Sequence, residues 1–103
     1  MTKTIIAMLL AFSAAPALAE TPQIATSVVE TADLDLSSQS GQQALDRRLN
    51  QAVKEVCGTA SDVDVAGKND VRRCRVDTLA GLASERDQRI AAASSQPIKV
   101  AAR

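Results

Sequence analysis

The sequence predicts a mainly α-helical fold, a disulfide-linked helical hairpin with a short extended N-terminal arm. Three observations predict it. An amphipathic pattern runs from Ser37 to Cys57, a second helical pattern opens near Asp70 and contains Cys74, and an alternating segment precedes both. A helix with one apolar stripe must bury that stripe against another element, so the two helices are expected to pack together.

The first helix has the clearest pattern in the chain. Ser37 or Ser40 can provide its N-cap, and Ser40 with Gln43 matches a capping box. Gly58 follows Cys57 as a C-terminal stop. At about 100° per residue, the apolar side chains fall within an arc of about 100°. They are Leu45, Leu49, Ala52, Val53 and Val56.

The second helix is predicted from about Asp70 to Ala92, after a polar loop over residues 59–68, with Asn69 or Asp70 as its cap. One stripe consists of Val71, Cys74, Thr78 and Leu82. Arg75 and Arg86 are eleven residues apart and therefore nearly in line. Two interpretations stay open for them: long side chains that extend over apolar surface, or an arginine pair in a groove that receives a partner's carboxylates.

The alternating segment spans residues 28–36. In an extended chain Ala32, Leu34 and Leu36 face one side, and Asp33 and Asp35 the other. No other segment has a convincing strand pattern. The arm is therefore expected to pack on the helices or to pair with another chain, because an unpaired strand edge invites pairing.

The N-terminus has the three parts of a secretory signal peptide. They are a basic start at Lys3, the apolar run Ile5–Phe12, and a small-residue site at Ala17–Ala19. We expect cleavage after Ala19 and a periplasmic location. No later apolar run approaches the ~20 residues that span a bilayer, so no membrane span is expected in the mature chain. The predicted organisation is a signal peptide (1–19), a flexible leader (20–27), a small helical domain (28–92) and a mobile tail (93–103).

The composition limits both the core and the chemistry. The chain has 103 residues, no His, and Phe12 as its single aromatic residue. The mature core must therefore consist of Leu, Val, Ile and Ala, a thin supply for a small domain. Two cysteines in a short exported chain predict a structural disulfide between Cys57 and Cys74. Free thiols, an intermolecular bond and a catalytic thiol are the alternatives, and the last would lack a His partner.

Two charged clusters are candidate sites. The loop Asp62–Gly67 matches the first, third and sixth positions of a calcium-binding EF-hand loop, but Ala66 and Arg73 replace the fifth and twelfth ligands. A solvated acidic loop, with no metal and no cofactor, is expected instead. Arg72, Arg73 and Arg75 form a basic cluster without aromatic stacking platforms, so no nucleic-acid partner is expected.

The order of motifs resembles the UrcA family of small exported bacterial proteins. The resemblance covers about Val28 to Leu82. It rests on D-L-D-L-S at Asp33–Ser37, on Gly41, on Leu45-x-x-Arg48-Leu49 with Ala52, on Val56-Cys57-Gly58 and on the later Cys74. The chain departs from the family in having Thr31 where members often have Tyr. The resemblance implies an envelope location and paired cysteines, and it implies no catalytic residues.

The sequence therefore predicts a small exported protein that is not an enzyme. We expect a binding or interaction protein of the cell envelope, with a stress-responsive role within that hypothesis. Its partner would be another protein or a second copy of the chain. The candidate contact residues are Asp33, Asp35, Arg75 and Arg86. The alternative is a metal-handling protein or small enzyme that uses Asp33, Asp35, Asp62 and Asp64.

Overall fold

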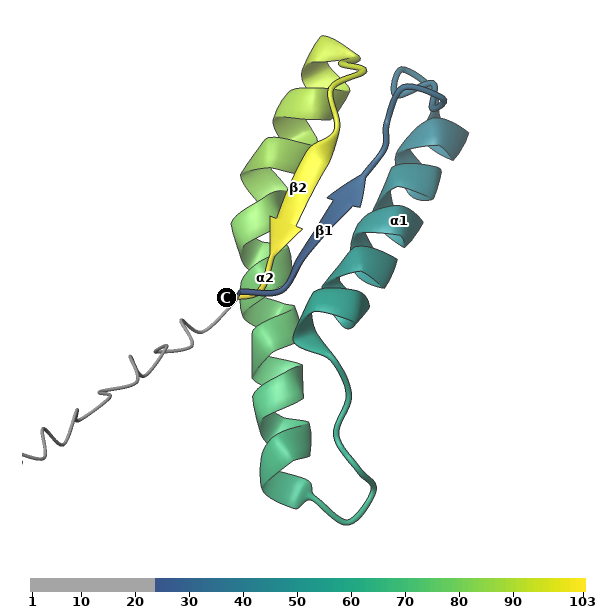
Figure 1. Cartoon of the computed structure of the whole chain (residues 1–103). Coiled ribbons are helices and arrows are strands. Elements are labelled where there is room, and N and C mark those ends of the chain that lie inside the picture. The colour runs from purple at the N-terminus through teal and green to yellow at the C-terminus, as the bar shows by residue number, and fades with distance from the viewer. Residues whose placement is uncertain (1–23) are drawn as a thin grey trace, which may run out of the picture.

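Two helices and a two-stranded sheet make up the fold. The computed structural model describes residues 24–103, in the order β1 (Thr26–Val29), α1 (Gln39–Cys57), α2 (Val65–Ala92) and β2 (Ile98–Ala101). The helices run side by side, and the strands lie together over one face of the helix pair (Figure 1). The mainly helical, disulfide-linked hairpin is confirmed. The predicted signal peptide lies outside the described residues.

The first helix follows its sequence pattern closely. Its N-cap, however, is Ser38 and not the predicted Ser37 or Ser40: the Ser38 hydroxyl accepts a hydrogen bond from the Gly41 N–H at 3.0 Å, and Ser40 lies inside the first turn. The helix ends at Cys57, and Gly58 follows with a positive φ of 68° that glycine adopts without strain. All five residues of the predicted apolar stripe are buried.

The second helix begins five residues earlier than predicted. Asp64 is its N-cap, and the Asp64 carboxylate accepts from the Gly67 N–H at 2.8 Å. A Cβ atom at residue 67 would clash with that carboxylate, so glycine leaves room for this cap. The predicted caps, Asn69 and Asp70, lie inside the helix instead. The predicted end at Ala92 is correct.

The disulfide joins the two helices at one end of the hairpin. Cys57 and Cys74 are bonded, and their Cα atoms are 5.7 Å apart. From the predicted stripe of α2, Thr78 and Leu82 are buried and Cys74 is half-buried. The core continues from this stripe to α1 and the sheet.

The C-terminal segment, expected to be a mobile tail, is part of the core. Residues 98–101 form β2, which pairs antiparallel with β1, with Thr26 opposite Ala101 and Val29 opposite Ile98. The Ile98 and Val100 side chains are both 0% exposed. The domain therefore extends beyond the predicted boundaries at residues 28 and 92, and the predicted leader (20–27) overlaps the start of β1. Ile98, Lys99 and Val100 alternate between apolar and polar, but three residues are a weak strand signal in a sequence with no recognisable partner strand.

The extended arm is shorter than predicted. The strand ends at Val29, and two turns follow. In the first, the Leu34 N–H donates to the Thr31 carbonyl at 3.0 Å, and in the second, the Ser38 N–H donates to the Asp35 carbonyl at 3.1 Å. Leu36 is buried, but Ala32 is exposed, so the predicted single apolar side is wrong. The turns break the alternation that an extended chain would keep.

Thr31 links the two chain segments that enclose the sheet. Its side chain is buried, and its hydroxyl donates to the Gln96 carbonyl at 2.8 Å. A buried hydroxyl needs such an acceptor. Thr31 thus connects the exit of β1 to the entry of β2.

Candidate functional site: the groove beside β1

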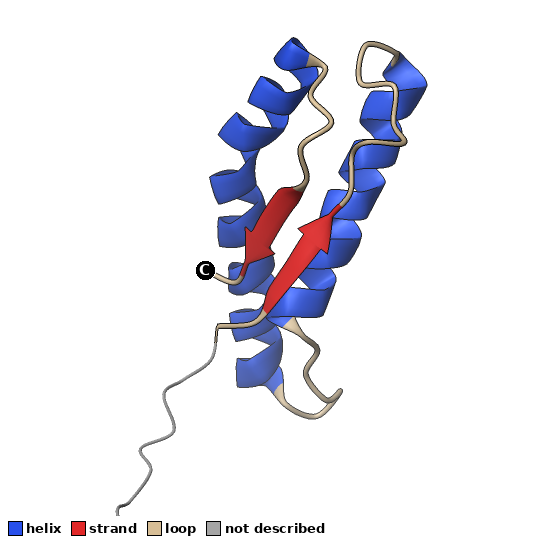
Figure 2. Ribbon diagram, turned by 45° about the horizontal axis from the view of Figure 1, so that its top comes forward, coloured by secondary structure: helices blue, strands red, loops and turns tan. Residues whose placement is uncertain are grey.

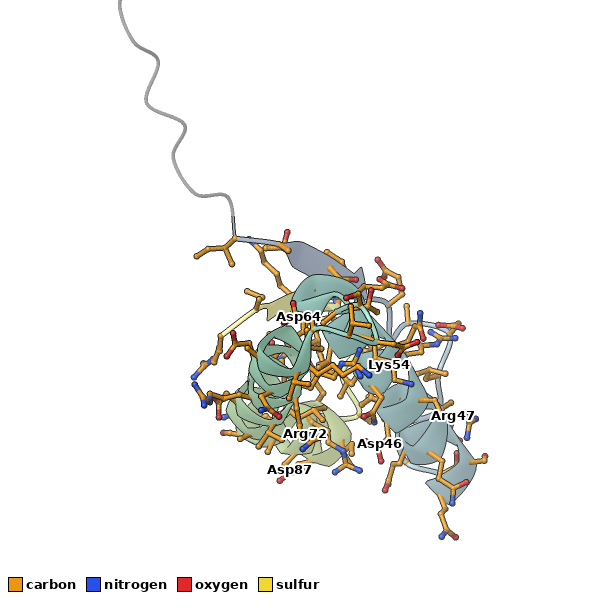
Figure 3. All side chains as sticks on the ribbon, turned by 90° about the horizontal axis from the view of Figure 1, so that it is seen from below. Asp46, Arg47, Lys54, Asp64, Arg72 and Asp87 are labelled. Atoms are coloured by element: carbon orange, nitrogen blue, oxygen red, sulfur yellow. A yellow bond between two sulfur atoms is a disulfide. The ribbon has the colours of Figure 1, made fainter. Side chains whose placement is uncertain are left out.

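The two predicted contact arginines each bind groups within the chain. The Arg75 Nη2 donates to the Gly58 carbonyl at 3.1 Å. Arg86 forms a two-pronged ion pair with Asp46 of α1, with Nη2 to Oδ2 at 2.8 Å, and also contacts Asp87 at 2.9 Å. Figure 3 labels Asp46 on the side of α1 that faces α2. The structure does not bring Arg75 and Arg86 together into one carboxylate-binding pair.

The Asp46–Arg86 pair joins the helices far from the disulfide. The guanidinium of Arg86, through its hydrogen bonds, lowers the pKa of Asp46, and burial opposes that shift. Asp46 in turn raises the pKa of Arg86. Both groups stay charged across the ordinary pH range, so the contact is a structural clamp between α1 and α2.

Asp33 and Asp35 also have separate roles. Asp33 forms a two-pronged ion pair with Arg48, at 2.7 and 2.6 Å, and these hydrogen bonds lower the pKa of Asp33 to about 2. Asp35 accepts from the Ser37 N–H at 3.1 Å. A carboxyl group with so low a pKa carries no proton to donate near neutral pH.

The acidic loop residues are engaged individually as well. Asp64 caps α2, and the Asp62 carboxylate pairs with Lys68 at 3.0 Å. Within residues 24–103, no three Cys, Asp or Glu side chains lie close enough together to hold a metal ion. The structure therefore does not gather Asp33, Asp35, Asp62 and Asp64 into one cluster.

An open groove of about 530 Å³ separates β1 from the outer face of α1. The sequence pattern did not predict it. Figure 2 shows β1 beside α1, and Figure 3 labels Arg47 on the outer side of that helix. The groove is lined by residues 27–30 of β1 and by Ala44, Arg47, Arg48, Gln51, Ala52 and Glu55 of α1. Apart from Ala52, which belongs to the buried stripe, the helical lining residues recur at helical spacing beside that stripe, and this spacing is visible in the sequence.

The unpaired edge of β1 borders this groove. The Ala102 N–H donates to the Ala25 carbonyl at 3.3 Å, which makes Ala25 and Ala102 a hydrogen-bonded pair. Antiparallel pairs alternate, so Ser27 and Val29 also bond β2, whereas Thr26, Val28 and Glu30 direct their backbone groups to the opposite edge. The Glu30 carbonyl accepts from Arg48 of α1 at 2.8 Å, as this alternation requires.

Val28 is an open position at the centre of that edge, between Thr26 and Glu30. Within residues 24–103, no hydrogen bond reaches its N–H or C=O from the groove side. Its side chain is 58% exposed on the outer face of the sheet. Next to it, the Ser27 hydroxyl donates to Glu55 at 3.2 Å, which fixes β1 against α1. The edge is therefore held in place and can accept a further strand.

Comparison with protein-family models, with curated proteins and with solved structures returned no match. The resemblance to the UrcA family stays a prediction from the motifs. None of the helices among residues 24–103 is both long enough and apolar enough to cross a bilayer.

Proposed function

We propose that this chain is a non-enzymatic interaction protein of the periplasm that binds an extended polypeptide segment by strand addition to β1. The observation that carries the proposal is the unpaired Val28 backbone at the rim of the groove. An exposed strand edge supplies main-chain hydrogen bonds for affinity, and neighbouring pockets select alternate side chains.

The groove adds specificity to that edge. A strand laid along β1 would place every second side chain toward α1. Ala44 and Ala52 leave room for apolar side chains there, and Arg47 and Glu55 line the same groove with opposite charges. A segment with small apolar residues at alternate positions and charged flanks suits this lining.

Export is the second part of the proposal. It rests on the signal-peptide pattern ending at Ala19 and on the resemblance to an exported family. A stress-responsive role in the envelope belongs to the same hypothesis. The disulfide supports export, because such bonds form and persist in oxidising compartments.

Crosslinking in intact cells tests the proposal. A photoreactive amino acid replaces Val28 in one variant and Val63 in a control, since Val63 is also an exposed valine, at 91% exposure, but lies in the loop before α2. We expect a discrete protein adduct from position 28 in the periplasmic fraction and none from position 63. Equal labelling at both positions, or no adduct from position 28, would contradict strand addition.

A further inference from the structure

A second pocket lies beside the loop that follows α1. Its volume is about 310 Å³, and it is lined by Thr59, Ala60, Lys68, Val71, Arg72 and Arg75. The three cations follow one another at four and three residues along α2, so they share one side of the helix. Figure 3 labels Arg72 on α2, well apart from Arg47 at the groove.

The pocket carries an excess of positive charge. Within residues 24–103, the one salt bridge to its three cations joins Lys68 to Asp62. The lining residues carry three positive charges, and with the carboxylate of Asp62, the salt-bridge partner of Lys68, these four groups sum to +2. Like charges one helical turn apart repel, and the exposed Asp62 contributes little compensation. This arrangement favours binding of an anion.

A buried, unpaired donor on Arg75 is the second observation that favours an anion in this pocket. Its Nη2 is held by the Gly58 carbonyl at 3.1 Å, whereas its Nε is buried and has no acceptor within the described chain. An unpaired buried donor is unfavourable, and most native donors of this kind have a partner. On the loop side, the N–H groups of Thr59 and Ala60 donate to no backbone carbonyl among residues 24–103.

We infer that this pocket binds a phosphate group. A phosphate dianion matches the net charge of +2, and its oxygens match the forked N–H donors of arginine. The phosphate can come from inorganic phosphate in solution or from a lipid headgroup. The inference does not depend on the strand-addition proposal, because the pocket and the groove share no residue.

Titration of the protein with inorganic phosphate, followed by amide NMR at constant ionic strength, tests the inference. We expect saturable shifts at Thr59 and Ala60. Arg72→Gln is expected to weaken binding about tenfold, the usual effect of losing a charge-assisted hydrogen bond. Arg73→Gln is the matched control, because Arg73 is the exposed neighbour of Arg72, carries the same charge and does not line the pocket. Its affinity should stay within about twofold of the wild type.

A second arm separates the two sources of phosphate. Vesicles of phosphatidylcholine, with or without phosphatidic acid, are sedimented with each variant. Binding that requires phosphatidic acid and Arg72 assigns a lipid headgroup, whereas saturable shifts with inorganic phosphate and no vesicle binding assign the soluble ion. The inference is overturned if neither probe binds, or if Arg73→Gln weakens binding as much as Arg72→Gln, since bulk charge would then explain the effect.

Discussion

Replacing Ile98 by alanine should remove a large part of the stability of the domain. Ile98 is 0% exposed and lies opposite Val29 in the sheet, within the cluster that includes Leu45 and Leu49. Truncating a fully buried isoleucine to alanine costs about 2–5 kcal/mol. Small domains unfold with about 5–15 kcal/mol, so this one side chain accounts for a large share of the total.

Urea unfolding, followed by far-ultraviolet circular dichroism, measures the loss. Intrinsic fluorescence cannot, because residues 24–103 contain no Phe, Trp or Tyr. With a urea m-value of about 1.5 kcal/mol/M, a loss of about 3 kcal/mol lowers the midpoint by about 2 M. If the variant is unfolded in water, Ile98→Val gives a readable loss of about 0.5–1.5 kcal/mol.

Lys99→Ala is the control, since Lys99 lies between the two buried positions of β2 and is exposed. Its free energy of unfolding should stay within about 0.5 kcal/mol of the wild type. An Ile98→Ala protein as stable as the Lys99→Ala protein would show that β2 adds nothing to the core, and the reasoning on the C-terminal segment would be refuted.

Three further predictions concern the fixed points of the fold. Reducing the disulfide, which closes a separation of 17 residues, should lower the free energy of unfolding by about 3 kcal/mol, and unchanged urea midpoints with and without reductant would contradict this. Asp33 should titrate with a pKa of about 2 by carboxyl NMR, and Arg48→Gln should return it toward 3.8. Because that pKa is lowered on folding, the stabilisation is complete above 3.8 and is lost as the pH falls through about 2; a wild-type value near 3.8 would exclude the ion pair in solution. Gly41→Ala should destabilise the protein, because the new Cβ would clash with the Asp35 carbonyl oxygen. This clash should outweigh the helix propensity of alanine, which exceeds that of glycine by about 1 kcal/mol. A raised urea midpoint would contradict the close packing of this turn.

The parts of the fold that depend on local chemistry were predictable from the sequence. The helix from Gln39 to Cys57 has a regular apolar stripe and a glycine stop where the sequence predicts them, and its serine-rich start contains the cap, at Ser38, one residue after the predicted Ser37. The cysteine pair was predictable because the sequence predicts export, and two cysteines in a short exported chain usually form a disulfide. The start of α2 was predicted five residues too late. Its cap is Asp64, whose carboxylate accepts from the Gly67 N–H, and a glycine at that position weakens the helical pattern in the sequence.

The parts that depend on long-range pairing were not predictable. The strand from Ile98 to Ala101 is four residues long, and its partner lies about 70 residues earlier in the chain. Without that pairing, neither the free edge of β1 nor the open position at Val28 can be recognised. The prediction that Arg75 and Arg86 act together as one carboxylate-binding pair was wrong for a similar reason. Their acceptors, Gly58 and Asp46, belong to α1 and its C-cap, and a pattern within α2 cannot reveal them.

Binding of an extended segment to the Val28 backbone edge can be tested from the opposite wall of the groove. A photoreactive residue is placed at Arg47, and wild-type Val28 is compared with Val28→Pro in intact cells. Proline removes an N–H that β2 does not use, so the fold should persist, as circular dichroism can check. We predict that the adduct from position 47 disappears in the Val28→Pro protein. An adduct of unchanged intensity in a folded Val28→Pro protein would contradict strand addition.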